Sequence, residues 1–188
     1  MSKSSLPSLI VLCAALVACS DNGASAALTA PDAGPAVSLA IGGRASGHIG
    51  FNFATPTVGL ATEQYSFTAL STEPAPTFAA KGQFALMLTA ATGVEQKFHG
   101  DVICMNIVGN TARIAGQLTK VWINNVQRPI TGATHVIWTV VDNGEGQGTP
   151  DFGSPMFFNN ATNAPLHCTA GFTPPQFANQ EGNVQVQP

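Results

Sequence analysis

The apolar residues that follow position 44 recur at every second place, which is the spacing of half-buried β-strands. Tyr65 and Phe67 alternate with polar neighbours, and Phe84, Leu86 and Leu88 repeat the spacing further along. Two denser runs, 102–108 and 135–141, carry apolar residues in both phases. We therefore expect these two runs to be central strands that are covered on both faces.

Further strands are predicted over shorter stretches of apolar residues that are bounded by glycine or polar residues. These stretches are 45–53, 79–90 with an extension at 95–99, 111–118, 154–158, 166–172 and 182–187. The sequence thus predicts about eight or nine strands, and no stretch of about ten residues has helical spacing.

Turn residues support the same strand boundaries. Gly109-Asn110 separates two apolar runs by two residues and supplies the positive φ that a tight hairpin needs. The run 142–146 is a second turn signal, which closes the strand over 133–141 and opens a longer loop to Asp151.

Strands joined mainly by short turns favour an antiparallel sheet that folds on itself. We therefore predict an all-β fold over residues 44–188, a single antiparallel β-sandwich or β-barrel. The spacing does not distinguish the two architectures.

The N-terminus has the parts of an export signal. Lys3 precedes an apolar stretch over 9–17, which is shorter than the about 20 residues that span a bilayer. Leu16-Val17-Ala18-Cys19 resembles the bacterial lipobox, so we expect residues 1–18 to be a lipoprotein signal peptide and Cys19 to be acylated. The alternative is an ordinary signal peptide with an incidental cysteine.

Residues 19–43 are rich in Ala, Gly, Ser, Asp and Pro, and they are predicted to be a lipidated flexible tether. The partner implied by Cys19 is the lipid bilayer, and the expected location is the cell envelope. By resemblance to sorted lipoproteins, Ser20 after the cysteine, in place of Asp, is compatible with the outer membrane, facing periplasm or exterior, in a host with two membranes.

Composition excludes one class of partner. Charged residues make up 9% of the chain, against about 25% in average soluble proteins. The few lysines and arginines form no basic stripe of the kind that binds nucleic acid, so no nucleic-acid partner is expected.

Cysteine usage agrees with export. Apart from Cys13 in the signal and Cys19, the chain has an even pair, Cys104 and Cys168, which we expect to be bridged in an oxidising compartment. The alternative is a pair of buried free thiols. Neither cysteine has the neighbours of a zinc site, since His167 is merely adjacent to Cys168.

Several segments resemble a family of uncharacterised bacterial secreted and lipoprotein β domains. The matching stretches are 99–104 (HGDVIC), 108–112 (VGNTA), 140–146 (VVDNGEG), 150–151 (PD) and 182–184 (GNV), with support from Phe67 and from Lys81-Gly82. The resemblance spans roughly residues 45–187. It implies a shared β domain and attaches no activity to it.

An acidic loop is the best candidate for a site. Asp142, Asn143, Glu145 and Asp151 place four oxygen-bearing side chains among glycines, and calcium prefers such oxygen ligands on a flexible backbone. Their spacing differs from that of a helix–loop–helix calcium site, and the same residues are typical of a hairpin turn. A structural turn and a calcium site both stay open, and no other cofactor is expected.

Histidines give a weaker hypothesis. His99 and His135 lie in or beside predicted strands, where pairing could bring them to Asp101 or Asp142 as a metal or acid–base site. Solvated or hydrogen-bonded packing roles are the alternative.

No catalytic motif is present: the chain lacks a Gly-x-Ser-x-Gly elbow, a phosphate-binding glycine loop and a His-Glu-x-x-His helix. The sequence therefore favours a noncatalytic envelope lipoprotein with a structural, adhesive or binding role and a protein or small-molecule partner. One alternative is a small-molecule or calcium-binding β module, for which aromatics would line a cavity. The other is an unrecognised hydrolase centred on the acidic loop.

Overall fold

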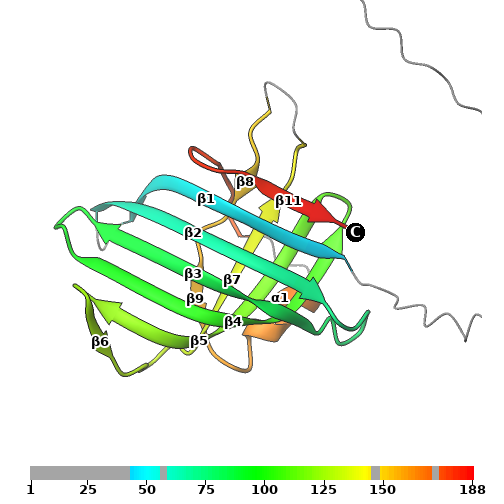
Figure 1. The fold of residues 1–188 in the computed structure, drawn as a ribbon, viewed down its shortest axis with the longest axis horizontal. Helices are drawn as coiled ribbons and strands as arrows, with labels where there is room; N and C mark the ends of the chain where they lie inside the picture. Colours follow the sequence, from blue (N-terminus) through cyan, green and yellow to red (C-terminus); the bar gives the residue numbers. More distant parts are fainter. Residues whose placement is uncertain (1–42, 56–58, 145–148, 171–173) are drawn as a thin grey trace, which may run out of the picture. The chain divides into compact units, whose positions relative to one another are not determined.

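The computed structural model describes residues 43–55, 59–144, 149–170 and 174–188. It is an all-β domain in which eleven strands form one antiparallel sheet (Figure 1). The strands are β1 (Arg44–Thr55), β2 (Gly59–Ser71), β3 (Ala80–Ala90), β4 (Glu95–Val108), β5 (Thr111–Ile123), β6 (Val126–Arg128), β7 (His135–Val141), β8 (Phe152–Gly153), β9 (Phe157–Asn159), β10 (Phe177–Ala178) and β11 (Val184–Gln187).

The sheet runs in the order β10-β8-β7-β5-β4-β3-β2-β1-β11, with β6 paired to β5 and β9 paired to β7. The all-β prediction is confirmed, and the single sheet curls on itself as an open barrel whose strand path does not close. The predicted number of strands was too low because three very short strands, β6, β8 and β10, carry little apolar pattern.

Aromatic side chains meet across the interior of the barrel. The fully buried Trp138 of β7 lies 5.8 Å from the ring of Phe67 on β2 and 5.4 Å from the ring of Phe84 on β3. Since β4 and β5 separate β7 from β3 along the sheet, these contacts require the sheet to curl. In Figure 1, β7 runs behind β1–β4 at a steep angle to them.

Two glycines make room for the Phe84 ring. A Cβ atom at Gly100 of β4 or at Gly116 of β5 would lie 2.4 Å from that ring. The register between these strands shifts beside Gly100, as expected where a sheet bends. Large aromatic rings and small inward residues thus fit together in the core.

Two hairpin turns have different sequence signals. Gly109 has a φ of 60° and Val108 pairs with Thr111, so the predicted two-residue turn is confirmed. The sequence analysis did not predict the β5–β6 turn at Asn124-Asn125. In the structure both asparagines have positive φ, at 48° and 64°. Asparagine tolerates this conformation better than most residues, which was the available signal.

Three predicted strands differ from the structure. Residues 95–99, predicted as an extension of 79–90, begin β4, and of 154–158 only the last two residues lie in a strand, β9. The third prediction is wrong altogether. The stretch 166–172 falls largely on a helix, α1 (Ala164–Thr169), while 171–173 lie outside the described residues. Pro165 occupies the first turn, where its missing N–H costs nothing. The buried residues Ala164, His167 and Cys168 have helical spacing, which is the signal that the strand interpretation overlooked.

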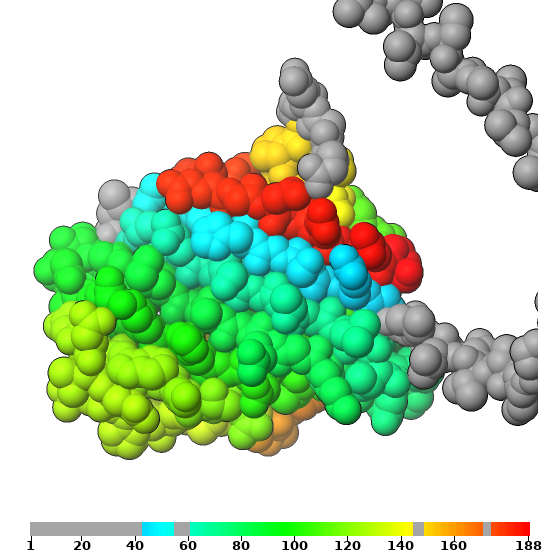
Figure 2. Space-filling view, viewed as in Figure 1, coloured from blue at the N-terminus to red at the C-terminus, as the bar shows by residue number. Residues whose placement is uncertain are grey.

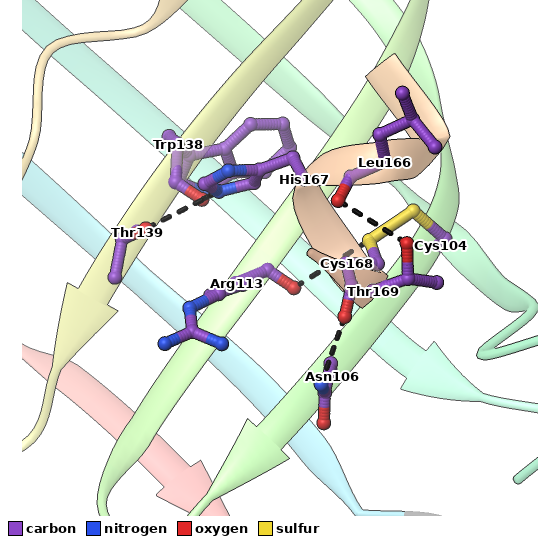
Figure 3. Close-up of a disulfide and its surroundings, with 9 residues drawn as sticks. All are labelled: Cys104, Asn106, Arg113, Trp138, Thr139, Leu166, His167, Cys168 and Thr169. Atoms are coloured by element: carbon purple, nitrogen blue, oxygen red, sulfur yellow. Dashed lines mark hydrogen bonds between the residues drawn. A yellow bond between two sulfur atoms is a disulfide. The ribbon is translucent and has the colours of Figure 1, made fainter. Parts of the chain in front are cut away.

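The helix is bound to the outer face of the barrel (Figure 3). The Cys104–Cys168 disulfide is confirmed, with an S–S distance of 2.08 Å. The Asn106 amide donates to the carbonyl of Cys168 at 2.8 Å, and His167 Nε2 lies 2.9 Å from the carbonyl oxygen of Trp138. The helix therefore covers β4, β5 and β7, which explains why the runs 102–108 and 135–141 are apolar in both phases.

A seam remains where β11 faces the segment that follows β7. β11 pairs with β1 on one side only, and its other edge presents the N–H groups of Val184 and Val186. Asp151 Oδ2 accepts from Val184 N at 2.7 Å, and Asp142 Oδ2 accepts from Val186 N at 2.8 Å. Figure 2 shows the C-terminal residues in red between β1 in cyan and the yellow segment near residue 150. Carboxylates thus supply the acceptors that a further strand would otherwise provide.

We predict that Asp151→Asn lowers the free energy of unfolding by about 1–3 kcal/mol. Asp151 is buried, and its second oxygen accepts from Asn143 N at 2.9 Å, so an amide would turn an N–H group toward one of these donors. Denaturant unfolding of a full chain that carries Cys19→Ser measures the change.

The matched control is Asp101→Asn on the exposed face of β4, where a change within about 0.5 kcal/mol is expected. Equal effects of the two substitutions would contradict the role of Asp151 in the seam.

Candidate functional site

A hollow of about 510 Å³ lies at one end of the barrel, where β5 separates from β7. The first part of β5 pairs with β7 through Gln117, whereas its last residues, Val121–Ile123, pair with β6. The chain then returns to β7, and Leu118 N donates to the carbonyl of Thr134 at 2.9 Å. The hollow is therefore positioned by a fork in the sheet.

The wall of the hollow is mainly apolar. Phe98, Leu118 and Val121 are buried core residues that form its inner part, while Phe158 of β9 is 43% exposed. The rings of Phe98 and Phe158 meet edge to face with centroids 4.9 Å apart. The lining residues are Gln96, Phe98, Leu118, Val121, Ile123, Arg128, Pro129, Ile130, Thr131, Ala133 and Phe158.

The chemistry of this lining suits binding rather than catalysis. Its polar side chains are Gln96, Thr131 and Arg128, and only the Arg128 guanidinium carries a charge. An apolar cavity of this size with few polar groups is typical of small-molecule sites. Nucleophilic or acid–base catalysis needs a paired nucleophile and base, and none is found among these described lining residues.

A buried carboxyl lies close to the hollow on the neighbouring strands. Glu63 of β2 is 2% exposed, and its Oε1 accepts from Met156 N at 2.7 Å. Glu63 pairs with Leu88 on β3, and Leu88 pairs with Gln96 on β4, which lines the hollow. Two strand spacings correspond to about 10 Å between Glu63 and Gln96.

Burial raises the pKa of Glu63 to about 8, and the hydrogen bond from Met156 lowers it by a smaller amount. Burial of the Tyr65 hydroxyl likewise raises the pKa of Tyr65, and the negative charge of the nearby Glu63 raises it further. The Tyr65 hydroxyl donates to the carbonyl of Ser154 at 2.9 Å. Glu63 and Tyr65 thus attach β2 to the link between β8 and β9.

Sequence reasoning missed Glu63 as a candidate. The available signal was its phase, because position 63 falls between the inward-facing Ala61 and Tyr65. A carboxyl in the apolar phase of a strand is unusual and is a candidate functional group.

The residues of the acidic loop are engaged in the turn and the seam. Asp142 Oδ1 accepts from Gly144 N at 2.7 Å, and the amide of Asn143 donates to the carbonyl of Pro150 at 2.7 Å. Glu145 lies outside the described residues. Within the parts of the chain that the structure describes, no group of three or more His, Cys, Asp and Glu side chains could hold a metal. Calcium binding by Asp142, Asn143, Glu145 and Asp151 stays a prediction.

The two histidines of interest are not brought together. His99 lies on the exposed face of β4 with its ring 4.9 Å from that of Trp122. His135 is buried, its Nδ1 lies 2.8 Å from Thr134 Oγ1, and burial lowers its pKa. Gln117 of β5 pairs with Asp101 of β4 on one side and with His135 of β7 on the other, so it separates these two residues. His135 begins β7, and Asp142 comes directly after its last residue.

Two other predictions concern the membrane. Cys19 and the signal peptide lie outside the described residues, so acylation stays a prediction. Among the helices that the structure describes, none has the length and apolar content required to cross a bilayer.

Comparison with known proteins gives no match to a family model, to a curated protein or to a solved structure. The resemblance to secreted and lipoprotein β domains therefore stays a prediction. A fold by itself does not define an activity, whereas the geometry and chemistry of a site limit what it can bind.

We predict that Glu63→Gln removes a component of the pH dependence of stability. Because the folded-state pKa of about 8 exceeds the 4.5 of an ordinary glutamate, the folded chain binds this proton more tightly than the unfolded chain. The contribution of Glu63 to the free energy of unfolding is therefore most favourable at low pH, and it falls as the pH rises from about 4.5 to about 8, by up to about 5 kcal/mol.

Denaturant unfolding at about pH 5 and about pH 9 checks this, and Glu63→Gln is expected to be the more stable chain at the higher pH only. Glu73→Gln, at an exposed position, controls for loss of a surface carboxylate. A Glu63→Gln chain whose stability falls with pH as steeply as the parent would contradict the prediction.

The calcium hypothesis predicts a higher melting temperature in calcium than in chelator, since a ligand that binds only the folded state stabilises it. Substitution of Glu145 by Gln should reduce that difference, because one ligand would lose its charge. Identical melting curves in calcium and chelator would eliminate the hypothesis.

Proposed function

We propose that the chain is a noncatalytic envelope lipoprotein, held by acylated Cys19, whose β domain binds a small apolar or amphipathic molecule at the open end of the barrel. The hollow lined by Phe98 and Phe158 carries the proposal. Its volume of about 510 Å³ lies within the range of small-molecule sites, which is about 300–1,000 Å³.

The lining also indicates the class of ligand. The apolar wall favours a hydrocarbon or aromatic body, and burial of this body contributes about 25 cal/mol per Å² of apolar surface. Arg128 is the one charged residue on the lining and is exposed. An acidic group on the ligand would find its complementary charge there. The proposed ligand is therefore an anionic amphiphile, such as a fatty acid.

The alternative function for an envelope lipoprotein of this kind is a structural or adhesive role. The fork between β5 and β7 favours binding, because it leaves the hollow open. If β5 and β7 stayed paired along their whole length, the strands would occupy this space. The exposed fraction of Phe158, 43%, also fits a side chain that a ligand would cover.

The test measures binding of a fluorescent fatty-acid analogue to the full chain carrying Cys19→Ser. Saturable binding is expected, and Phe158→Ala should weaken it about tenfold because an aromatic contact is lost. The matched control is Phe157→Ala, since Phe157 is 38% exposed, adjoins Phe158 and does not line the hollow.

Arg128→Gln separates the charge from the apolar contact. It should weaken binding of the anionic analogue about tenfold and leave the corresponding neutral alcohol unchanged. Absence of saturable binding, or equal losses with Phe157→Ala and Phe158→Ala, would contradict the proposed site.

A further inference from the structure

A second hollow, of about 500 Å³, lies on β1, β2 and β3, at the end of the sheet opposite to the proposed ligand site. Arg44 pairs with Leu70, and Leu70 pairs with Lys81, so the three residues form one row across three strands. All three are exposed, Leu70 to 47%. The hydroxyls of Ser46 and Thr68 lie in the same lining.

This row is a local positive patch on a chain of net charge −3. Arg44 and Lys81 form no ion pair with any residue that the structure describes, and no carboxylate lines the hollow. Two cations that flank an apolar side chain match the surface of an anionic membrane, where phosphates lie above the hydrocarbon.

The row also lies at the point where the chain leaves for the membrane. Arg44 is the first residue of β1, and only positions 20–43 separate it from Cys19. Even a fully extended segment of that length spans at most about 85 Å. An anchor at Cys19 thus confines this end of the domain near the bilayer.

We propose that Arg44, Leu70 and Lys81 form a docking surface for the anionic headgroups of the membrane that carries the anchor. The proposal rests on the acylated Cys19 of the proposed function. Near an anionic bilayer each cation strengthens the contact about fivefold, which is too little to recruit a free protein. It suffices to orient a domain that is already anchored, because the contact is then intramolecular.

Docking through this row would turn the ligand-binding hollow away from the membrane. On β3, Lys81 lies seven residues before Leu88, the partner of Gln96. Seven residues of strand correspond to about 23 Å. The proposed ligand site would then open toward the aqueous space.

The experiment compares the reactivity of lysines in the full acylated chain on vesicles. The vesicles contain phosphatidylcholine alone or phosphatidylcholine mixed with phosphatidylglycerol, and a neutral amine-reactive reagent modifies the lysines. Mass spectrometry then gives the rate at each lysine. We expect modification of Lys81 to slow at least about threefold on the anionic vesicles, while the exposed Lys120 of β5 reacts at the same rate on both.

Arg44→Gln should restore most of the Lys81 reactivity, and Lys97→Gln, which removes a cation near the opposite end, should not. Equal Lys81 rates on the two vesicles would overturn the proposal, as would equal slowing of Lys81 and Lys120. Loss of the protein from both vesicles would refute the anchor instead. Ligand binding by the Cys19→Ser chain is measured separately, so its failure is distinguishable.

Discussion

The barrel depends on two carboxylates that take the place of a missing strand pairing. One edge of β11 has N–H groups without a neighbouring strand, and Asp142 and Asp151 accept from Val186 and Val184. An ionised carboxylate offers only acceptors, and its hydrogen bonds are stronger than those of neutral groups. The seam thereby closes without a ladder, so the 151–156 segment can lie inside and cover the aromatic core.

The hollow and the buried carboxyl follow from this arrangement. The link between β8 and β9 bends inward, where Met156 N meets Glu63 and Ser154 accepts from Tyr65. β9 then continues along β7 and places Phe158 against Phe98, opposite the fork of β5. The same chain segment that closes one end of the seam therefore forms a wall of the proposed ligand site.

The sequence predicted features that depend on local spacing. Alternation identified β2 and β3, Gly109-Asn110 identified its hairpin, and an even pair of cysteines identified the disulfide. It did not predict α1, because a short helix and a short strand can have the same proportion of apolar residues. They differ only in the spacing of those residues. The seam and the hollow depend on contacts between residues far apart in the chain, such as Asp142 with Val186, which no local pattern encodes.

Amide hydrogen exchange at Val184 and Val186 tests the carboxylate seam most directly. Both amides are expected to exchange as slowly as those of the β1–β2 ladder, and Asp142→Ala should accelerate exchange at Val186 selectively. Exchange of both amides at the rate of an unprotected peptide in the parent chain would contradict the carboxylate seam.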